Sequence, residues 1–519
     1  MSSRILLRSG QRWAYRLQPL SGHHGLLNRH GAASAYSVAS ARTELFDVVI
    51  VGGGIAGATL ARGLGANPVL RGRKVAMVES SDLSKVRNWD GSNLNTVYSN
   101  RTVSITPASQ TTLTACGVWS EVDQSRIQPY CEMHVWDGVS NGQVNFNSRD
   151  LTSPETLAAA SRRDGHEGAP MAWIMENLNL HRAALRALDR PVAAKTVEVM
   201  DQTRVETITT GLAASLSHDT DPAVPSEWPR VHLSSGRTLA ARLLVGADGA
   251  NSPVRNYSKI GSAGWPYEQH GIVATLKLED SMVNTAAWQR FLPTGPVAIL
   301  PMPNNYAALV WSMDKAHVPG LKALNEADFA TALNVALRLP FEDLQYLLDH
   351  LGSDRLNLTA EYGQSLAAIA DTPSNSPRAS SLPPWVARVE PHSRASFPYK
   401  LQHADRYIGQ RVALIGDAAH TVHPLAGQGL NLGMLDVASL LRVLETAVLN
   451  GQDIGDYNCL LGYSSERYFP NLAMVGAVDK LQRLFSTSFG PLAAVRSLGL
   501  NAVNHFPLLK NEFVKVAMG

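Results

Sequence analysis

The chain has 519 residues, of which 45% are hydrophobic and 17% charged, enough for two or more domains with a sizeable core. No apolar run reaches the ~18 residues of a membrane-spanning helix, and three scattered cysteines favour neither a disulfide framework nor a zinc site. The net charge of +2 includes six arginines from the first 42 residues, so it predicts no binding to nucleic acid.

The first 42 residues differ in composition from the rest of the chain. They contain six arginines, seven serines and no aspartate or glutamate. One face of a helix would carry the four arginines that recur every fourth residue, Arg4, Arg8, Arg12 and Arg16. An arginine-rich, acid-free amphipathic leader predicts a mitochondrial transit peptide over residues 1–42, with a disordered basic tail as the alternative.

A glycine motif follows the first predicted strand, residues 45–51. Gly52, Gly54 and Gly57 form the pattern G-x-G-x-x-G, and residues 58–64 continue it as a helix of small side chains. The first glycine allows a tight turn, the second lets a pyrophosphate approach the backbone, and the third lets helix and strand pack closely. The motif therefore predicts a dinucleotide-binding fold, without choosing between FAD and NAD.

A second predicted strand, residues 74–78, ends at Glu79. A carboxylate at this position binds a ribose hydroxyl in dinucleotide folds. The spacing from the glycines exceeds the usual ~20 residues, which a lengthened turn over residues 67–72 explains. Glu79 is therefore predicted to contact the same dinucleotide.

The middle of the chain contains two further candidates. Arg101 begins a predicted strand-to-helix passage. After a predicted helix at 180–188 and a hairpin at 231–245, the run Gly246–Arg255 places Asp248 directly behind a buried strand. Taken alone, Arg101 is consistent with a surface arginine and Asp248 with a turn residue.

Residues 261–390 contain predicted strands at 270–278 and 307–311, from which we expect a sheet laid over the cofactor. Two stretches, 217–229 and 373–384, are rich in Pro, Ser and Asp and predict surface loops.

The stretch from residue 412 to residue 436 combines three local signals. A buried strand at 412–415 is closed by Gly416 and Asp417, a loop rich in Gly and Pro follows, and a helix starts near Gly429. Exposed backbone N–H groups at a helix N-terminus form a site for anions and polar rings. The Asp417 carboxylate can accept hydrogen bonds from ligand hydroxyls, a contact worth ~1.5–3 kcal/mol.

The run HPLAGQGLNLGMLD, from His423 to Asp436, resembles the signature of the ubiquinone-biosynthesis flavin hydroxylases, a branch of the FAD-dependent aromatic hydroxylases. The run AWQRFLPTGP at 287–296 resembles the same branch, and the resemblance covers nearly the whole chain after residue 43. It implies that Gly416–Asp417 holds the ribityl chain of FAD and that the Pro-rich loop lies beside the isoalloxazine.

The cofactor-binding residues predicted from the motifs and the resemblance are Gly52, Gly54, Gly57, Glu79, Arg101, Asp248, Asp417, Pro424, Gly427, Gly429 and Asn431. No catalytic residue and no metal ligand is assigned. His420 and His423 are predicted to structure their loop rather than to act as a base.

The implied fold is α/β: a Rossmann-like FAD-binding domain of the aromatic-hydroxylase type, an interleaved sheet-based substrate domain and a C-terminal helical tail. The predicted bounds are 43–130, 172–260 and 391–470 for the FAD-binding domain, 131–171 and 261–390 for the substrate domain, and 471–519 for the tail. From Asn471 the tail is amphipathic, which suits either packing on the FAD-binding domain or a surface for a membrane or a partner protein.

The resemblance implies an FAD-dependent monooxygenase that hydroxylates the ring of a polyprenyl-4-hydroxybenzoate-type intermediate of ubiquinone biosynthesis at carbon C5. Reduced flavin and O₂ form a C4a-hydroperoxide that transfers oxygen to the electron-rich ring, so the protein has to position the ring and exclude water. The resemblance also implies electrons from ferredoxin and its reductase, a ubiquinone-biosynthesis protein complex, and a peripheral position on the matrix face of the mitochondrial inner membrane.

Two alternatives remain at this point. One is an NADPH-dependent hydroxylase of a soluble aromatic acid. A basic cluster in the substrate pocket would favour this alternative, whereas an apolar tunnel would favour the ubiquinone branch. The other is a non-catalytic flavin-binding subunit of a biosynthetic complex.

Overall fold

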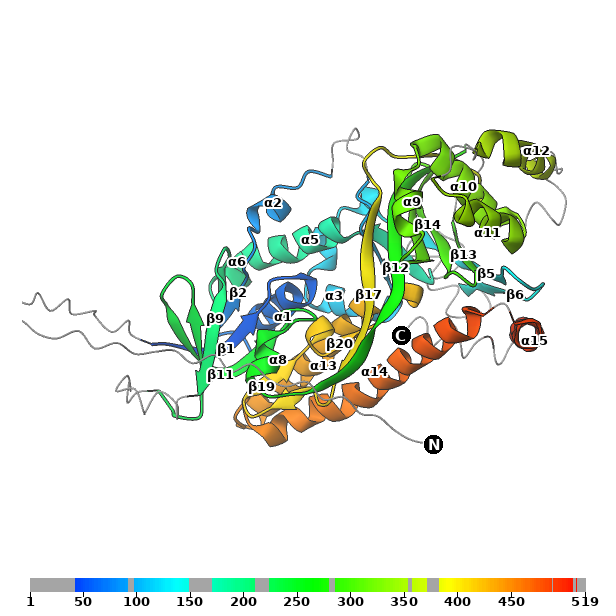
Figure 1. Ribbon diagram of the computed structural model, residues 1–519. Coiled ribbons are helices and arrows are strands. Elements are labelled where there is room, and N and C mark those ends of the chain that lie inside the picture. The colour runs from blue at the N-terminus through cyan, green and yellow to red at the C-terminus, as the bar shows by residue number, and fades with distance from the viewer. Residues whose placement is uncertain are drawn as a thin grey trace, which may run out of the picture. The chain divides into compact units, whose positions relative to one another are not determined.

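The computed structural model describes residues 43–91, 98–148, 170–210, 224–279, 285–352, 357–370, 382–487, 489–506 and 510. The predicted leader at 1–42 lies outside these residues, and so do most of the predicted loops at 217–229 and 373–384. Residues 41–519 form one compact unit, and its described part is built on two large sheets and one small sheet (Figure 1).

The first large sheet has eight strands in the described residues, with β1 near its centre. β1 runs parallel to both of its neighbours, β2 and β11, and such strands are covered on both faces, which is why they appear in the sequence as continuous apolar runs. The strands are β1 (Glu44–Val51), β2 (Val75–Val78), β8 (Val197–Met200), β9 (Val205–Thr210), β10 (Pro229–Leu233), β11 (Thr238–Gly246), β18 (Ile408–Gly409) and β19 (Val412–Leu414). The predicted strands at 45–51, 74–78 and 412–415 and the predicted hairpin are confirmed.

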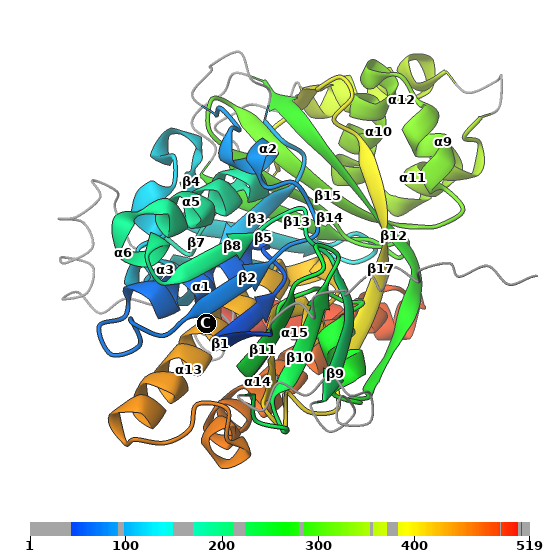
Figure 2. The same ribbon diagram turned by 90° about the vertical axis from the view of Figure 1, so that its left-hand side faces the viewer.

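Helices cover this sheet (Figure 2). Helix α1 (Ile55–Ala66) packs against α5 (Asn177–Asp189) and α13 (Gly429–Leu449), which confirms the helices predicted at 58–64, at 180–188 and from Gly429. The shorter helices of this half are α2 (Ser84–Arg87), α3 (Pro107–Ala115), α6 (Pro191–Ala194) and α8 (Pro253–Tyr257).

The second large sheet has nine strands in the described residues. Its longest strand, β12 (Ser262–Leu278), pairs antiparallel with β15 and with β17. The other strands are β5 (Glu132–Asp137), β6 (Gln143–Asn147), β13 (Ala286–Phe291), β14 (Val297–Met302), β15 (Tyr306–Asp314), β16 (Val386–Val389), β17 (Ala395–Ala404) and β20 (His420–Thr421). The predicted strands at 270–278 and 307–311 are confirmed. An apolar core separates this sheet from α9 (Val318–Ala323), α10 (Glu326–Arg338), α11 (Phe341–Asp349) and α12 (Leu358–Ala370).

Strands β17 and β20 carry the second sheet past residue 390. The predicted boundary between the substrate domain and the FAD-binding domain, at residues 390 and 391, therefore lies before the last two strands of this sheet. The division of residues 43–519 into domains stays a prediction, because residues 41–519 form one compact unit.

A small sheet joins the two halves and carries the predicted strand-to-helix passage. It consists of β3 (Thr102–Ile105), β7 (Ala172–Glu176) and β4 (Gln128–Tyr130). After β3, the Thr106 side chain accepts a hydrogen bond from Ser109 N, which caps α3. The passage that begins at Arg101 is confirmed.

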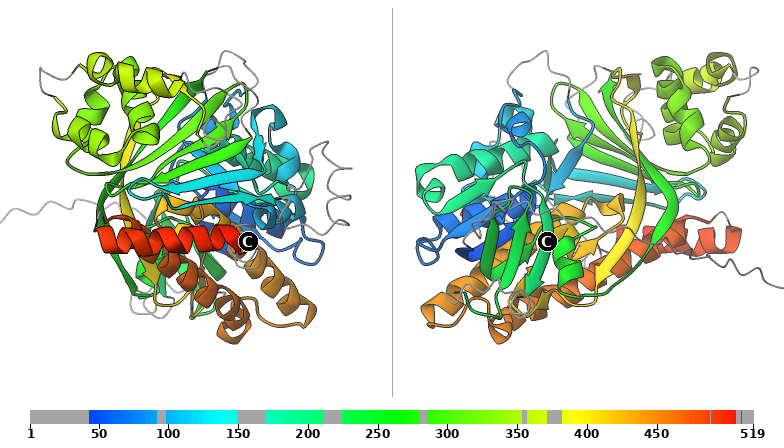
Figure 3. Two further views of the ribbon diagram at one scale, coloured as in Figure 1. Left: turned by 90° about the vertical axis from the view of Figure 1, so that its right-hand side faces the viewer. Right: turned by 60° about the vertical axis from the view of Figure 1, so that its left-hand side comes forward.

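Two helices end the described chain (Figure 3). α14 spans Tyr457–Phe485 and α15 spans Gly490–His505. The predicted helical character of the tail from Asn471 is confirmed, but α14 itself begins fourteen residues before Asn471 and continues through Pro470. Proline usually interrupts a helix, but buried contacts of Tyr463 and Arg467 fix the preceding turns. No helix of the described residues is long and apolar enough to cross a membrane.

Candidate active site

The turn between β1 and α1 shows how its three glycines differ. Gly52 has a φ of +106°, and a Cβ there would lie 2.2 Å from Ala247 O. A Cβ on Gly57 would lie 2.0 Å from Gly52 O, so helix and strand could not approach each other. Around Gly54 a Cβ would meet no described atom within 4 Å. The fold requires the first and third glycines, whereas the second faces open space at the N-terminus of α1, where a phosphate is stabilised.

Glu79 follows β2 and ties this turn in place. Its Oε2 accepts a hydrogen bond from Gly53 N at 2.7 Å, and its Oε1 accepts one from Ser81 N at 2.8 Å. Burial raises the pKa of Glu79, but the hydrogen bonds from Ser81 and Gly53 outweigh burial and hold the pKa below its usual range. Glu79 is therefore an ionised carboxylate that already has two backbone partners.

Asp248 follows β11, the strand beside β1. Its Oδ2 accepts a hydrogen bond from Val254 N at 3.1 Å, whereas its buried Oδ1 has no hydrogen-bond partner among the described residues. Burial raises the pKa of this carboxyl. A buried carboxylate oxygen without a partner is costly, and a ligand group that donates a hydrogen bond would remove the cost.

Asp436, a fully buried carboxylate of α13, fixes the turn after β19. Its Oδ2 accepts a hydrogen bond from Gly416 N at 3.0 Å and lies 2.6 Å from His420 Nε2. Its Oδ1 accepts hydrogen bonds from Arg467 Nε at 3.1 Å and Asn471 Nδ2 at 3.0 Å. Burial raises the pKa of Asp436, but His420 and Arg467 outweigh burial and lower the pKa. This network fastens the turn to α13 and α14 together.

Asp417 is placed differently, although it is the next residue after Gly416. Its side chain is exposed to a cavity. The protein around that cavity displaces water, which raises the pKa of the carboxyl, and nearby His420 opposes the rise. The Asp417 carboxylate is thus accessible to a ligand on a turn that buried groups hold rigid.

His423 structures the loop that follows, as predicted. Its Nδ1 accepts a hydrogen bond from Leu425 N at 3.1 Å. Burial lowers the pKa of His423 to about 4, so its ring is neutral at pH 7. His420 also serves the loop, through its contact with Asp436.

Asn431 links the same loop to the small sheet. Its Nδ2 donates to Ser104 O at 2.8 Å and to Gly427 O at 3.2 Å. Its Oδ1 accepts a hydrogen bond from Thr106 N at 3.1 Å. Asn431 therefore positions the loop from within and does not reach the cavity.

These elements surround one cavity of about 1270 Å³. The predicted residues that line it are Gly54, Arg101, Asp417, Pro424, Gly427 and Gly429. The predicted residues that lie behind the lining are Gly52, Gly57, Glu79, Asp248 and Asn431. The structure therefore brings together six predicted residues from three separate segments and places the other five behind them, in the elements that support the lining.

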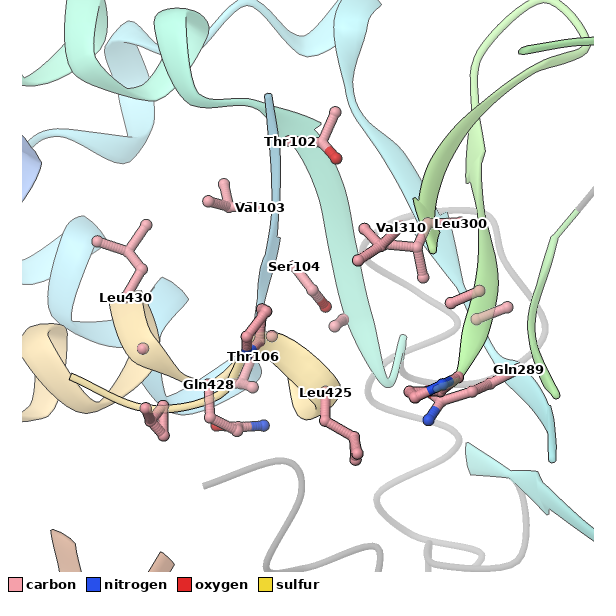
Figure 4. A pocket seen from close by; sticks show the side chains of 18 of the residues that line it. Thr102, Val103, Ser104, Thr106, Gln289, Leu300, Val310, Leu425, Gln428 and Leu430 are labelled. Atoms are coloured by element: carbon pink, nitrogen blue, oxygen red, sulfur yellow. The ribbon is translucent and has the colours of Figure 1, made fainter. Parts of the chain in front are cut away.

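The second large sheet forms the opposite wall of the cavity, which is mostly apolar. Figure 4 shows Leu300, Val310 and Gln289 on this wall, across the space from Leu425 and Gln428 of the loop. Gln289 is buried in the protein and lines the cavity. A polar amide at an otherwise apolar wall is suited to orient a ligand.

The C-terminal helices form the third wall. Leu484 of α14 and Leu500 of α15 supply apolar surface. Arg496 of α15 also lines the cavity, but its guanidinium is committed to a buried pair with Asp137, with Nε 2.7 Å from Oδ2 and Nη2 2.9 Å from Oδ1. The same guanidinium donates to the Thr487 carbonyl at 2.8 Å.

Sequence reasoning did not assign Gln289 or Arg496. Gln289 had a usable signal, because it interrupts an apolar strand inside the run at 287–296. Arg496 had none, since a single arginine in an apolar tail does not reveal a partner more than 350 residues away.

Residues 378–475 match an FAD binding domain family. The chain is 37% identical over 481 residues to "Ubiquinone biosynthesis monooxygenase COQ6, mitochondrial" of Danio rerio, covering 92% of this chain and 90% of that protein. It is 35% identical over 517 residues to the human protein of the same name, covering 100% of both. The fold is similar to that of p-nitrophenol 4-monooxygenase from Pseudomonas putida, with a TM-score of 0.61, 16% identity, and coverage of 92% of this chain and 99% of the other.

The matched domain and these relatives define an FAD-dependent monooxygenase, and its fold is that of the aromatic hydroxylases. The chain belongs to the family of mitochondrial ubiquinone biosynthesis monooxygenases. This confirms the predicted family, fold class, enzyme class and FAD cofactor, and the protein is mitochondrial.

Proposed function

We propose that the protein hydroxylates C5 of the aromatic ring of a polyprenyl-4-hydroxybenzoate-type phenol, with O₂ as the oxygen source and a flavin C4a-hydroperoxide as the chemistry that bound FAD supplies. The observation that carries this proposal is the single cavity that joins the glycine turn and the Asp417 loop to an apolar sheet wall. Ubiquinone biosynthesis, in the names of the relatives, supplies the pathway.

The residues around the glycine turn fit the nucleotide part of FAD. The N-terminus of α1 at Gly54 would take the pyrophosphate, and the unpartnered Oδ1 of Asp248 would accept a hydrogen bond nearby. Glu79 would accept from a ribose hydroxyl, because a carboxylate oxygen with one donor keeps a free lone pair. Asp417 would accept from the ribityl hydroxyls.

The loop before α13 would hold the flavin ring. Pro424, Gly427 and Gly429 line the cavity, and Asn431 fixes their loop to β3. Arg101 approaches the same space from the other side. A ring placed here would face the sheet wall, where Gln289 could orient the phenol.

The apolar lining and the size of the cavity favour a prenylated substrate over a soluble aromatic acid. Arg101 and Arg496 are the only basic residues in the described lining, and Arg496 is neutralised by Asp137. Arg101 is therefore the basic residue of this lining that is suited to face the benzoate carboxylate. The volume of about 1270 Å³ exceeds the ~300–1,000 Å³ of ordinary ligand pockets, which suits a cofactor and an apolar chain in one space.

The remaining parts of the proposal concern partners. Ferredoxin and its reductase would deliver the electrons, a ubiquinone-biosynthesis protein complex would contain the enzyme, and the protein would lie on the matrix face of the inner membrane. The family resemblance supports these three points. An NADPH-dependent hydroxylase and a non-catalytic subunit are the competing functions.

The test combines product analysis with flavin reduction. FAD-loaded protein, ferredoxin, its reductase and NADPH are incubated with a prenylated 4-hydroxybenzoate, and mass spectrometry and NMR follow one added oxygen at C5. The matched substrate is 4-hydroxybenzoate without its chain, which we expect to react poorly. Fast anaerobic flavin reduction by NADPH alone, with preference for the unprenylated acid, would support the soluble-acid hydroxylase. FAD retention without any product would support the non-catalytic subunit.

A further inference from the structure

The outer side of α15 is apolar along its whole length. Phe489, which caps the helix, and Leu498 at its middle are 65% and 72% exposed, and Phe506 at its end is 62% exposed. Between Phe489 and Phe506, Arg496 is the only arginine, lysine, aspartate or glutamate, and it is buried in its pair with Asp137. The exposed side of the helix therefore carries no formal charge apart from any on His505.

The inner side of the helix is fastened to the edge of the second sheet. Asn501 Oδ1 accepts a hydrogen bond from Gln143 N at 3.3 Å, and Asn504 Oδ1 accepts one from Asn145 N at 3.2 Å. These donors belong to β6, the terminal strand of the sheet, so α15 covers an edge that would otherwise expose unpaired N–H groups. Figure 3 shows α15 at the surface of the molecule, and its exposed large side chains, among them Leu492 and Leu498, are apolar.

The outer face is continuous with the lining of the cavity. Leu492, Val495 and Leu498 follow one stripe of the helix, whereas Val495, Gly499 and Val503 line the cavity. Val495 belongs to both sets and is 63% exposed. Val495 thus joins the apolar outside of α15 to the wall of the cavity.

Basic residues precede and follow α15 in the chain. Lys480 and Arg483 are exposed on the last turns of α14; Arg483 pairs with Asp479, with Nε 2.9 Å from Oδ2, and lies over the exposed ring of Trp265 at 5.0 Å. Lys510 follows the other end of α15. An apolar helix face with flanking cations and an amphipathic aromatic ring is complementary to an anionic lipid interface.

We propose that the outer face of α15 docks on an anionic lipid bilayer and that the cavity opens to the lipid beside this helix. The proposal rests on the proposed function, because a prenylated phenol is itself a lipid. A bilayer would cover the apolar face and supply the cavity with its substrate through the same surface. A second copy of the chain or another protein could cover the face but would not deliver a lipid to Val495.

The test is flotation of FAD-loaded protein with vesicles of phosphatidylcholine and cardiolipin. Leu498→Glu should lower vesicle binding about tenfold or more, because a leucine that the bilayer would bury is lost and an anion is added next to anionic lipid. The matched control is Leu449→Glu on α13. Leu449 is 68% exposed, and this variant should bind vesicles as the unaltered protein does. Omission of cardiolipin should also weaken binding.

Two further measurements, FAD retention and the rate of hydroxylation, distinguish a loss of membrane binding from a loss of activity. Leu498 does not line the cavity, so Leu498→Glu should retain FAD and hydroxylate a short-chain phenol in solution at the normal rate, while a long-chain substrate in vesicles reacts slowly. Equal flotation of both variants, binding independent of cardiolipin, or a vesicle-free dimer that only Leu498→Glu disrupts would overturn the proposal. Flotation needs no turnover, so failure of the proposed function would appear separately, as normal flotation without product.

Discussion

The turn and loop from Gly416 to Gly429 and the helix α15 face the same cavity, but they are held in different ways. Behind the loop, Asp436 accepts four hydrogen bonds from the turn, from His420 and from α14. α15 is held by one buried ion pair, Arg496 with Asp137, by hydrogen bonds from the same guanidinium to the Leu484 and Thr487 carbonyls, and by two asparagine contacts to a sheet edge. The loop that would hold the cofactor is built rigid, whereas the wall formed by α15 has fewer polar attachments.

The largest expected effect comes from removing the centre of the loop network. Asp436→Ala leaves Arg467 buried without its carboxylate, and breaking a buried pair in this way costs about 3–5 kcal/mol of the free energy of unfolding. Urea denaturation of the FAD-free protein measures the loss. Ser439→Ala is the control, since it removes a buried hydroxyl of the same helix whose partner, Glu466, is at the surface. A loss below about 1 kcal/mol for Asp436→Ala would contradict the rigid-wall interpretation.

Breaking the attachment of α15 should have a more local effect. Arg496→Met leaves Asp137 buried without its cation, so we expect α15 to open and the amides of residues 490–505 to exchange faster with deuterium, while the rest of the chain is protected as before. Asp137→Ala combined with Arg496→Met should restore much of the protection, because a buried pair can be replaced by apolar groups at little cost. If the double variant exchanges as fast as the single one, the ion pair is not what holds the helix.

The contrast between the two walls also explains how far the sequence predicts the structure. The turn after β1 follows from local pattern, because Gly52 and Gly57 are required by backbone contacts only a few residues apart. The Asp436 network could not be predicted, since it joins side chains of two helices whose packing depends on the whole fold. The same applies to α14, in which tertiary contacts outweigh Pro470, and to the pairing of Arg496 with Asp137.

His423 should contribute to the pH dependence of the free energy of unfolding in acid. Burial holds the pKa of His423 at about 4, below its usual 6.5, so between these values the unfolded chain binds a proton that the folded protein does not. Stability is therefore full above pH 6.5 and falls as the pH drops towards 4, by about 3 kcal/mol in all. His423→Gln should flatten this part of the pH profile of unfolding, while the part due to His403, whose pKa is also about 4, remains. An unchanged slope in the variant would show that His423 is protonated in the folded protein.

The smallest expected change in the fold, and the most direct test of the cofactor site, is Asp417→Asn. The Asp417 carboxylate makes no hydrogen bond to the described residues, so the FAD-free protein should unfold as before. The loss of an ionised acceptor for the ribityl hydroxyls should weaken FAD binding about ten- to a hundredfold, because a hydrogen bond to a charged group contributes ~1.5–3 kcal/mol.

Asp453→Asn provides the opposite control, since Asp453 pairs with Arg242 and Arg411 away from the cavity and should change stability but not FAD affinity. Retention of FAD through dialysis, followed by the flavin absorbance, distinguishes the two. Normal retention in Asp417→Asn would remove Asp417 from the cofactor site and leave Asp248, with its unpartnered oxygen, as the acid to test next.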